Sequence, residues 1–162
     1  MPMPVELRWP LSTMAPERPQ ALVLDTNIVL DLLVFNNPAT APLRALLQAG
    51  ALRWVATQPM RDELERVLNY PQIAPRVAFY GLGVASVLQA YDAQVQWEPV
   101  AARLSAVCKD ADDQKFIDLA AAHRAVLLSK DKAVLCMRKR LLQYGVFTAT
   151  ALVWAAAVAV AD

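Results

Sequence analysis

Residues 21–31 read "ALVLDTNIVLD". The four apolar residues at 21–24 are typical of a buried strand, and Asp25 follows them directly. A carboxylate at the end of a buried strand is costly unless a cation or hydrogen-bond donors compensate its charge. Asp25 is therefore our first candidate for a functional residue.

Short strand-like runs alternate with longer helical runs along the rest of the chain. We predict strands at residues 21–24, 52–56, 93–97, 125–129 and 145–147. One predicted helix begins near Thr40 and ends at Gly50, and another begins near Thr57 and ends near Asn69. This alternation predicts an α/β fold with a parallel sheet and helices on both of its faces.

The two ends of the chain differ from the middle. Residues 1–20 contain five prolines and no basic segment followed by an apolar run, which favours an irregular N-terminal arm over a secretory signal. The apolar stretch at 146–162 is rich in alanine and short of the ~20 residues that a membrane span needs. We expect a strand and a packed terminal helix there, and no membrane partner.

The composition indicates a globular protein, because 57% of the 162 residues are hydrophobic. A formal net charge of +1 gives no global attraction to nucleic acid, so local basic residues would have to hold one. The two cysteines, Cys108 and Cys136, lack metal-type spacing and fit reduced thiols. We therefore expect a cytoplasmic protein.

Glu63 lies beside the apolar stripe of the helix that we predict from Thr57. In "MRDELERVL" the stripe consists of Met60, Leu64, Val67 and Leu68. Glu63 is three residues from the first of these and four from the third, so it flanks the stripe. Glu65 is expected to project toward solvent.

Asp113 has a similar position in "DDQKFIDLAAA". It is spaced three, four and seven residues from Phe116, Ile117 and Ala120, which we predict to form the buried face of a helix. The helix macrodipole also favours an anion in the first turn. Asp118 points the opposite way, and we expect it to contact solvent or basic side chains.

Four carboxylates are expected to converge at the carboxyl end of the sheet, where ligands collect in such folds: Asp25, Glu63, Asp113 and Asp131. A divalent cation would offset their repulsion, and oxygen ligands suit Mg²⁺ or Mn²⁺, as one or two ions. Asn27 and Ser129 could orient the ligands. Such a site could hydrolyse a phosphodiester without a protein nucleophile.

The motifs at these residues resemble those of the PIN-domain family of metal-dependent ribonucleases, from about Ala21 to Thr150. "VLDTNIVLD" looks like the opening motif, with Asp25 as a ligand and Asn27 as a supporting residue. "RDELERVL", "KDADDQKFIDLA" and "LLSKD" are similar to the three later motifs. In this resemblance the later ligands are Glu63, Asp113 and Asp131, and Ser129 matches a hydroxyl residue.

The resemblance is to the bacterial branch described as toxin components of toxin–antitoxin systems. It implies a three-layer α/β/α sandwich with a central parallel sheet, in which residues 21–162 form a single PIN-like nuclease domain. It implies an endoribonuclease that uses Mg²⁺ or Mn²⁺ and is the toxin of a type II system. RNA, a cognate antitoxin and a second copy in a homodimer are the implied partners.

Simpler roles stay open for the acidic residues. Asp25 could cap the helix that begins near Thr26, Glu63 could interact with a helix dipole, and Asp113 and Asp112 could be a helix cap and its neighbour. Asp131 could lie in a solvated turn. Two other function classes also stay open: a non-catalytic PIN-like module that binds RNA or a partner, and a phosphotransfer protein with Asp25 as nucleophile.

Basic residues near the acidic motifs are the candidates for RNA contacts. Phosphate contacts position a nucleic acid without reading its sequence, so a cluster of cations is sufficient for this task. The candidates are Lys130, Lys132, Arg138, Lys139 and Arg140. An ordinary solvated surface is the alternative for each of them.

Overall fold

A computed structural model describes residues 4–10 and 18–154 of the chain. The strands are β1 (Glu6–Trp9), β2 (Gln20–Leu24), β3 (Leu52–Ala56), β4 (Gln96–Trp97), β5 (Val126–Leu128), β6 (Phe147–Ala149) and β7 (Ala151–Trp154). The helices are α1 (Thr26–Leu33), α2 (Ala41–Gln48), α3 (Gln58–Leu68), α4 (Ala74–Phe79), α5 (Val84–Gln94), α6 (Gln114–His123), α7 (Lys132–Leu135) and α8 (Arg138–Leu141). Three single 3₁₀ turns, η1 (Pro38–Thr40), η2 (Ala111–Asp113) and η3 (Leu142–Tyr144), complete the list.

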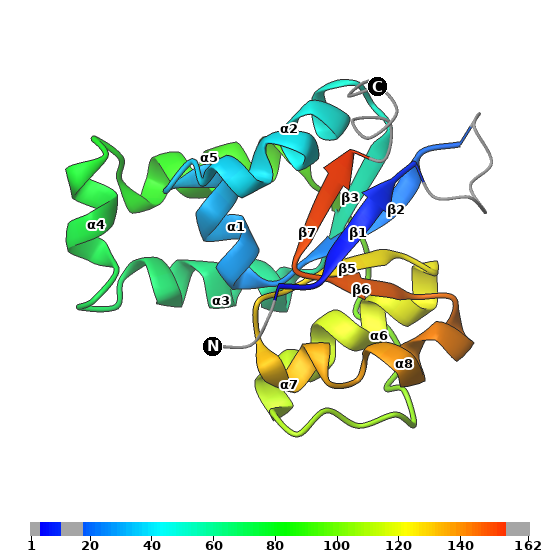
Figure 1. Ribbon diagram of the computed structural model, residues 1–162. Helices are drawn as coiled ribbons and strands as arrows, with labels where there is room; N and C mark the ends of the chain where they lie inside the picture. The colour runs from blue at the N-terminus through cyan, green and yellow to red at the C-terminus, as the bar shows by residue number, and fades with distance from the viewer. Residues whose placement is uncertain (1–3, 11–17, 155–162) are drawn as a thin grey trace, which may run out of the picture.

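Five strands form a parallel sheet in the order β4-β3-β2-β5-β6. Helix α2 packs on one side of this sheet, and α6 and α8 pack on the other (Figure 1). The α/β fold and the three-layer α/β/α sandwich that we expected are therefore confirmed. No helix of the described residues is long and apolar enough to cross a membrane.

The strand order places a topological switch point at the carboxyl end of β2. Strand β2 is central, with the next strand in sequence, β3, on one side and β5 on the other. The chain order reverses between β2 and β5, and such a switch point is where α/β sheets bind ligands. Backbone hydrogen bonds continue past the strands here, because Asp25 N donates to Leu128 O at 3.0 Å and Ser129 N donates to Ala149 O at 3.0 Å.

The two central strands are buried because helices cover both faces of the sheet. Residues 21–24 of β2 and 126–128 of β5 are all buried, which explains why their sequences are continuous apolar runs. Trp54 of β3 and Phe116 of α6 are among the largest fully buried side chains. This packing holds the carboxyl ends of the strands in fixed positions.

The prediction of an irregular arm over residues 1–20 is wrong for Glu6–Trp9. These residues form β1, which pairs in parallel with β7 in a separate two-stranded sheet. Val5 N donates to Thr150 Oγ1 at 3.1 Å, and Trp9 is buried. The prolines flank a proline-free window in which Leu7 and Trp9 can face the same side, and β7, from the other end of the chain, supplies the partner strand.

The other predicted elements are present with some changes of limits, such as β5, which is one residue shorter at each end than predicted, and β7 was not among the predicted strands. Helices α2 and α3 begin after Thr40 and Thr57, as we predicted. The strand predicted at 93–97 shrinks to β4 because α5 continues to Gln94. The strand predicted at 145–147 begins at Phe147 instead, because Gly145 ends a 3₁₀ turn with φ of 77°. The expected terminal helix falls outside the described residues.

Candidate metal centre

Asp25 joins the central strand to α1 and performs two tasks. Its side chain caps the helix, because Oδ1 accepts a hydrogen bond from Thr26 N at 2.7 Å. Its Oδ2 accepts a hydrogen bond from Ser129 Oγ at 2.5 Å. The capping role that we left open is therefore real. It does not exclude metal binding, since each carboxylate oxygen has a second lone pair.

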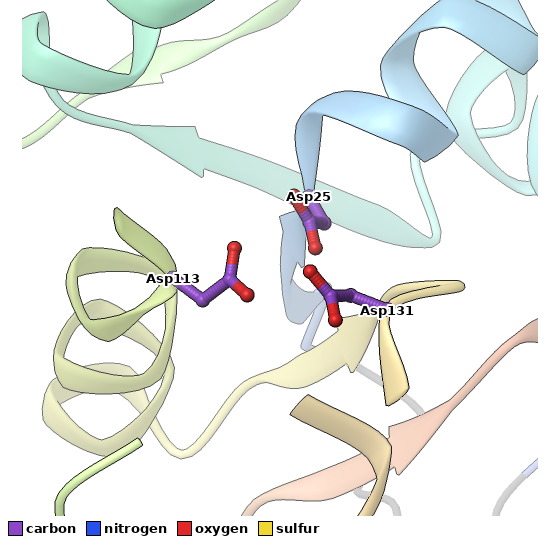
Figure 2. A group of neighbouring side chains, drawn as sticks. All are labelled: Asp25, Asp113 and Asp131. Carbon is purple, nitrogen blue, oxygen red and sulfur yellow. The ribbon is translucent and has the colours of Figure 1, made fainter. Parts of the chain in front are cut away.

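Asp113 and Asp131 approach Asp25 from two other segments. Asp113 ends η2 and precedes α6, and its Oδ2 is buried without a hydrogen-bond partner among the described residues. Asp131 precedes α7, and its Oδ1 accepts a hydrogen bond from Ala133 N at 2.9 Å. Both carboxyl groups point toward Asp25 (Figure 2).

These three residues form what we call the three-aspartate cluster. Each offers a carboxylate oxygen, and these oxygens lie within 4.8 Å of one another. Asp25 and Asp113 are buried, and Asp131 is partly exposed. The structure thus brings together three of the four carboxylates that the sequence selected.

Burial and crowding disfavour negative charge in the cluster. Burial raises the pKa of Asp113 from 3.8 to about 8, and a hydrogen bond between Asp113 and Asp131, followed by the charges of Asp25 and Asp131, adds to this rise. Burial also raises the pKa of Asp25 to about 6, although the hydrogen bond from Ser129 opposes the rise. Protons or a cation must therefore offset the charge of this cluster.

The donor set fits a hard divalent cation. All three candidate ligands are carboxylate oxygens, the donor type that suits Mg²⁺ and Mn²⁺. Oδ2 of Asp113 has no hydrogen-bond partner in the part of the chain that the structure describes, which is informative because buried polar atoms in native proteins usually have one. A bound cation would supply the missing partner and would relieve the repulsion.

Glu63, the fourth predicted ligand, lies outside the three-aspartate cluster. Its helix has the expected orientation, since Met60, Leu64 and Leu68 are buried while Glu65 is exposed. The Thr26 hydroxyl donates to Oε2 of Glu63. The Lys115 ammonium lies 2.6 Å from Oε1. Glu63 is still close enough for its charge to contribute to the raised pKa of Asp25, after the larger effect of burial.

Ser129 and Asn27, our candidates for supporting residues, hydrogen-bond to the segments that carry Asp25 and Asp131. Ser129 is fully buried, and its Oγ donates to Asp25 Oδ2 while accepting from Asp131 N at 2.9 Å. Asn27 Oδ1 accepts a hydrogen bond from Lys130 N at 3.1 Å. Ser129 therefore fixes the positions of Asp25 and Asp131 relative to each other. Asn27 fixes the backbone at Lys130, directly before Asp131.

A sequence profile of the PIN domain matches residues 21–133. The chain belongs to the PIN-domain family. The matched stretch contains Asp25, Glu63, Asp113 and Asp131, so the resemblance that the motifs indicated is confirmed. PIN domains are generally nucleases, and the buried acidic cluster is consistent with a hydrolase.

Among solved structures, this PIN domain is similar to one described as VapBC2 from Rickettsia felis bound to a DNA fragment from their promoter. The TM-score is 0.55 at 12% identity, and the match covers 80% of this chain and 98% of the other. At this level of identity the likeness shows a shared fold. A search of curated proteins found no match.

The predicted RNA contacts of the PIN domain fall into two groups. Lys130 Nζ lies 2.7 Å from Oδ2 of the buried Asp31, so this ammonium has a structural partner. The other four residues are exposed on α7 and α8, and none of them forms an ion pair with a described residue: Lys132, Arg138, Lys139 and Arg140. This second group is free to meet a polyanion.

Two features of the PIN domain are not as the sequence indicated. Asp118 is buried, not exposed, because its Oδ1 accepts hydrogen bonds from Leu104 N at 2.9 Å and Gln114 Nε2 at 2.8 Å. Lys115 contacts Glu63, although nothing in the motif pattern pairs them. The sequence feature that could have indicated a place near the site was the position of Lys115, two residues after Asp113.

Proposed function

We propose that this PIN domain is a divalent-metal-dependent endoribonuclease and the toxin component of a type II toxin–antitoxin system in the cytoplasm. The observation that carries the proposal is the buried, unpartnered Oδ2 of Asp113 within the three-aspartate cluster. A buried carboxylate oxygen that accepts no hydrogen bond from any described residue, beside two acidic neighbours, is poorly suited to a structural role. It is well suited to a cation.

In this mechanism Asp25, Asp113 and Asp131 hold the ion, which is Mg²⁺ or Mn²⁺. When bound, the ion supplies activation of water and stabilisation of the negative charge that grows on the phosphodiester. Ser129 keeps Asp25 and Asp131 in register through its two hydrogen bonds. Because Glu63 is engaged by Thr26 and Lys115, we assign it to the edge of the site and not to the ion itself.

The exposed cations on α7 and α8 are proposed to hold RNA phosphates. Helix α7, which carries Lys132, begins directly after Asp131, and α8, which carries the other three cations, follows α7 in the chain. Replacing Arg138, Lys139 and Arg140 with glutamine should weaken binding to RNA of any sequence. The slope of log affinity against log salt concentration should fall in magnitude by about 2 to 3. The exposed Arg103→Gln variant is a control that should change the slope by about one charge or less.

A cognate antitoxin and a homodimer are part of the proposal. The support is the motif resemblance to toxin components, together with the shared fold of VapBC2. A direct test is expression in a bacterial host. The wild-type chain should stop growth, and the Asp113→Asn variant should not. Equal growth arrest by both chains would contradict a toxicity that depends on cleavage.

The decisive test of the chemistry is cleavage of a generic single-stranded RNA by the purified chain. Cleavage should require Mg²⁺ or Mn²⁺, stop with EDTA and fail in the Asp113→Asn variant. Metal-independent cleavage would contradict the mechanism. Absence of Mn²⁺ binding would favour a non-catalytic module, and stable labelling of Asp25 by acetyl phosphate would favour phosphotransfer.

A further inference from the structure

Both carboxylate oxygens of Glu63 already have partners. Oε2 accepts a hydrogen bond from the hydroxyl of Thr26. Oε1 forms an ion pair with Lys115 Nζ at 2.6 Å, and the same ammonium donates to the backbone carbonyl of Asp112. The side chains of Lys115 and Glu63 are mostly buried, which strengthens the pair relative to one in solvent.

The partners of Glu63 belong to the same segments as the three-aspartate cluster. Thr26 follows Asp25 at the start of α1. Lys115 follows Asp113 by two residues in the first turn of α6. Glu63 is therefore positioned beside the cluster by the two segments that supply its aspartates. Its oxygens are nevertheless not among those that lie within 4.8 Å of one another.

Charge and geometry together limit how many ions this arrangement accepts. Nuclease sites with two ions hold them about 3.5–4 Å apart and need carboxylates on both sides of the pair. The three aspartates can ligate one ion. Glu63 is a further carboxylate close enough for its charge to act on Asp25, and a second ion bound to it would displace Thr26 and meet the Lys115 ammonium at close range.

We propose that Lys115 is a built-in cation that neutralises Glu63, so that the chain binds one divalent ion at the three-aspartate cluster and not two. This inference rests on the proposed function, because it concerns the ion of the same centre. It makes Lys115 a positioning residue that acts through Glu63. It also explains why an ammonium stands beside a centre that must attract cations.

The test is the number of Mn²⁺ ions bound per chain, measured by calorimetry and by electron paramagnetic resonance at pH 8. The wild-type chain should bind about one ion. Lys115→Met frees Glu63 and should bind about two, the second more weakly. Glu63→Gln combined with Lys115→Met should return to about one, because the second ion needs the Glu63 carboxylate.

Two further variants control for charge and folding. Lys109→Met removes an exposed lysine that precedes η2 in the chain and should keep the wild-type number of ions. Lys115→Arg retains a cation that pairs with carboxylates, so it should also keep that number. It provides a folded comparison if circular dichroism shows that Lys115→Met does not fold.

The inference is overturned if the wild-type chain binds two ions, or if folded Lys115→Met binds no more ions than wild type. Two bound ions in a chain that cleaves RNA would overturn this inference alone. Failure of the wild-type chain to bind any Mn²⁺ would overturn the proposed function and, with it, this inference. The two failures are therefore distinguishable.

Discussion

Two buried aspartates, Asp113 directly before helix α6 and Asp118 within it, have opposite environments. Asp118 lies in what we call the Asp118 network, where its Oδ1 accepts hydrogen bonds from Leu104 N and Gln114 Nε2. Asp113 lies in the three-aspartate cluster, where its Oδ2 has no donor among the described residues and acidic neighbours surround it. Burial alone thus does not identify a reactive carboxylate.

The difference between the two regions follows from how each aspartate is compensated. Hydrogen bonds to a charged acceptor are stronger than neutral ones, so the Asp118 network stabilises the loop before α6. In the cluster, burial and neighbouring charge raise the pKa of Asp113 to about 8. One region contributes to the fold, and the other is left available for a ligand. Matched substitutions can test this division.

The largest expected difference is in RNA cleavage. Asp113→Asn keeps the size of the side chain but removes a charged ligand, so cleavage with Mg²⁺ should fall by at least about a hundredfold. Asp118→Asn should keep cleavage within about threefold of wild type, because its carboxylate does not face the cluster. Equal losses in two folded variants, assayed on the same RNA, would remove the distinction between the regions.

The next effect is the pH dependence of Mn²⁺ affinity. Protons on Asp25 and Asp113 compete with the ion, and burial raises the pKa values of these residues to about 6 and about 8. Affinity should therefore rise between pH 6 and pH 8, by up to about tenfold per pH unit for each proton released. Calorimetry in two buffers would count these protons. A flat profile in wild type would count against the raised pKa values.

A smaller effect concerns stability without metal. The folded chain keeps the Asp113 proton to higher pH than the unfolded chain, whose ordinary pKa is 3.8. The free energy of unfolding should therefore fall as the pH rises from about 4 to about 8. Asp113→Asn should remove part of this fall and be about 1–2 kcal/mol more stable than wild type at pH 8. Urea titrations in EDTA would show it, and a destabilised variant would contradict it.

The smallest effect is expected in the Asp118 network. Asp118→Asn retains an acceptor for Leu104 N and Gln114 Nε2 but loses the charge that strengthens both bonds. The free energy of unfolding should fall by about 1 kcal/mol, without a change in Mn²⁺ affinity. Urea titration and calorimetry on one preparation would check both. Weaker Mn²⁺ binding would show that the two regions are coupled.

The parts of the site that the sequence predicted are those set by local periodicity. Asp25 follows a buried strand, and Asp131 follows another by a short turn, so a parallel sheet places both at one edge. Helix phase placed Asp113 on the inner side of α6. The same arguments predicted that strands and helices alternate but not the order of the strands in the sheet. That order depends on the pairing of β2 with β5, which joins residues that are far apart in sequence.

The parts that the sequence did not predict depend on long-range partners. Helix phase placed Asp118 toward solvent, but the loop that carries Leu104 covers that side of α6 and supplies a donor. Lys115 was one of several nearby lysines, and only tertiary packing brings it to Glu63. Residues 6–9 were expected to be irregular because their partner strand, β7, lies at the other end of the chain.

The central claim is that the three-aspartate cluster binds a divalent cation, and the most direct measurement is anomalous scattering from a crystal soaked in Mn²⁺. We expect one strong peak in contact with carboxylate oxygens of Asp25, Asp113 and Asp131, at about 2.0–2.3 Å, with no peak near Asp118. A soaked crystal with no anomalous density at the cluster, or with its strongest density elsewhere on the chain, would contradict the claim.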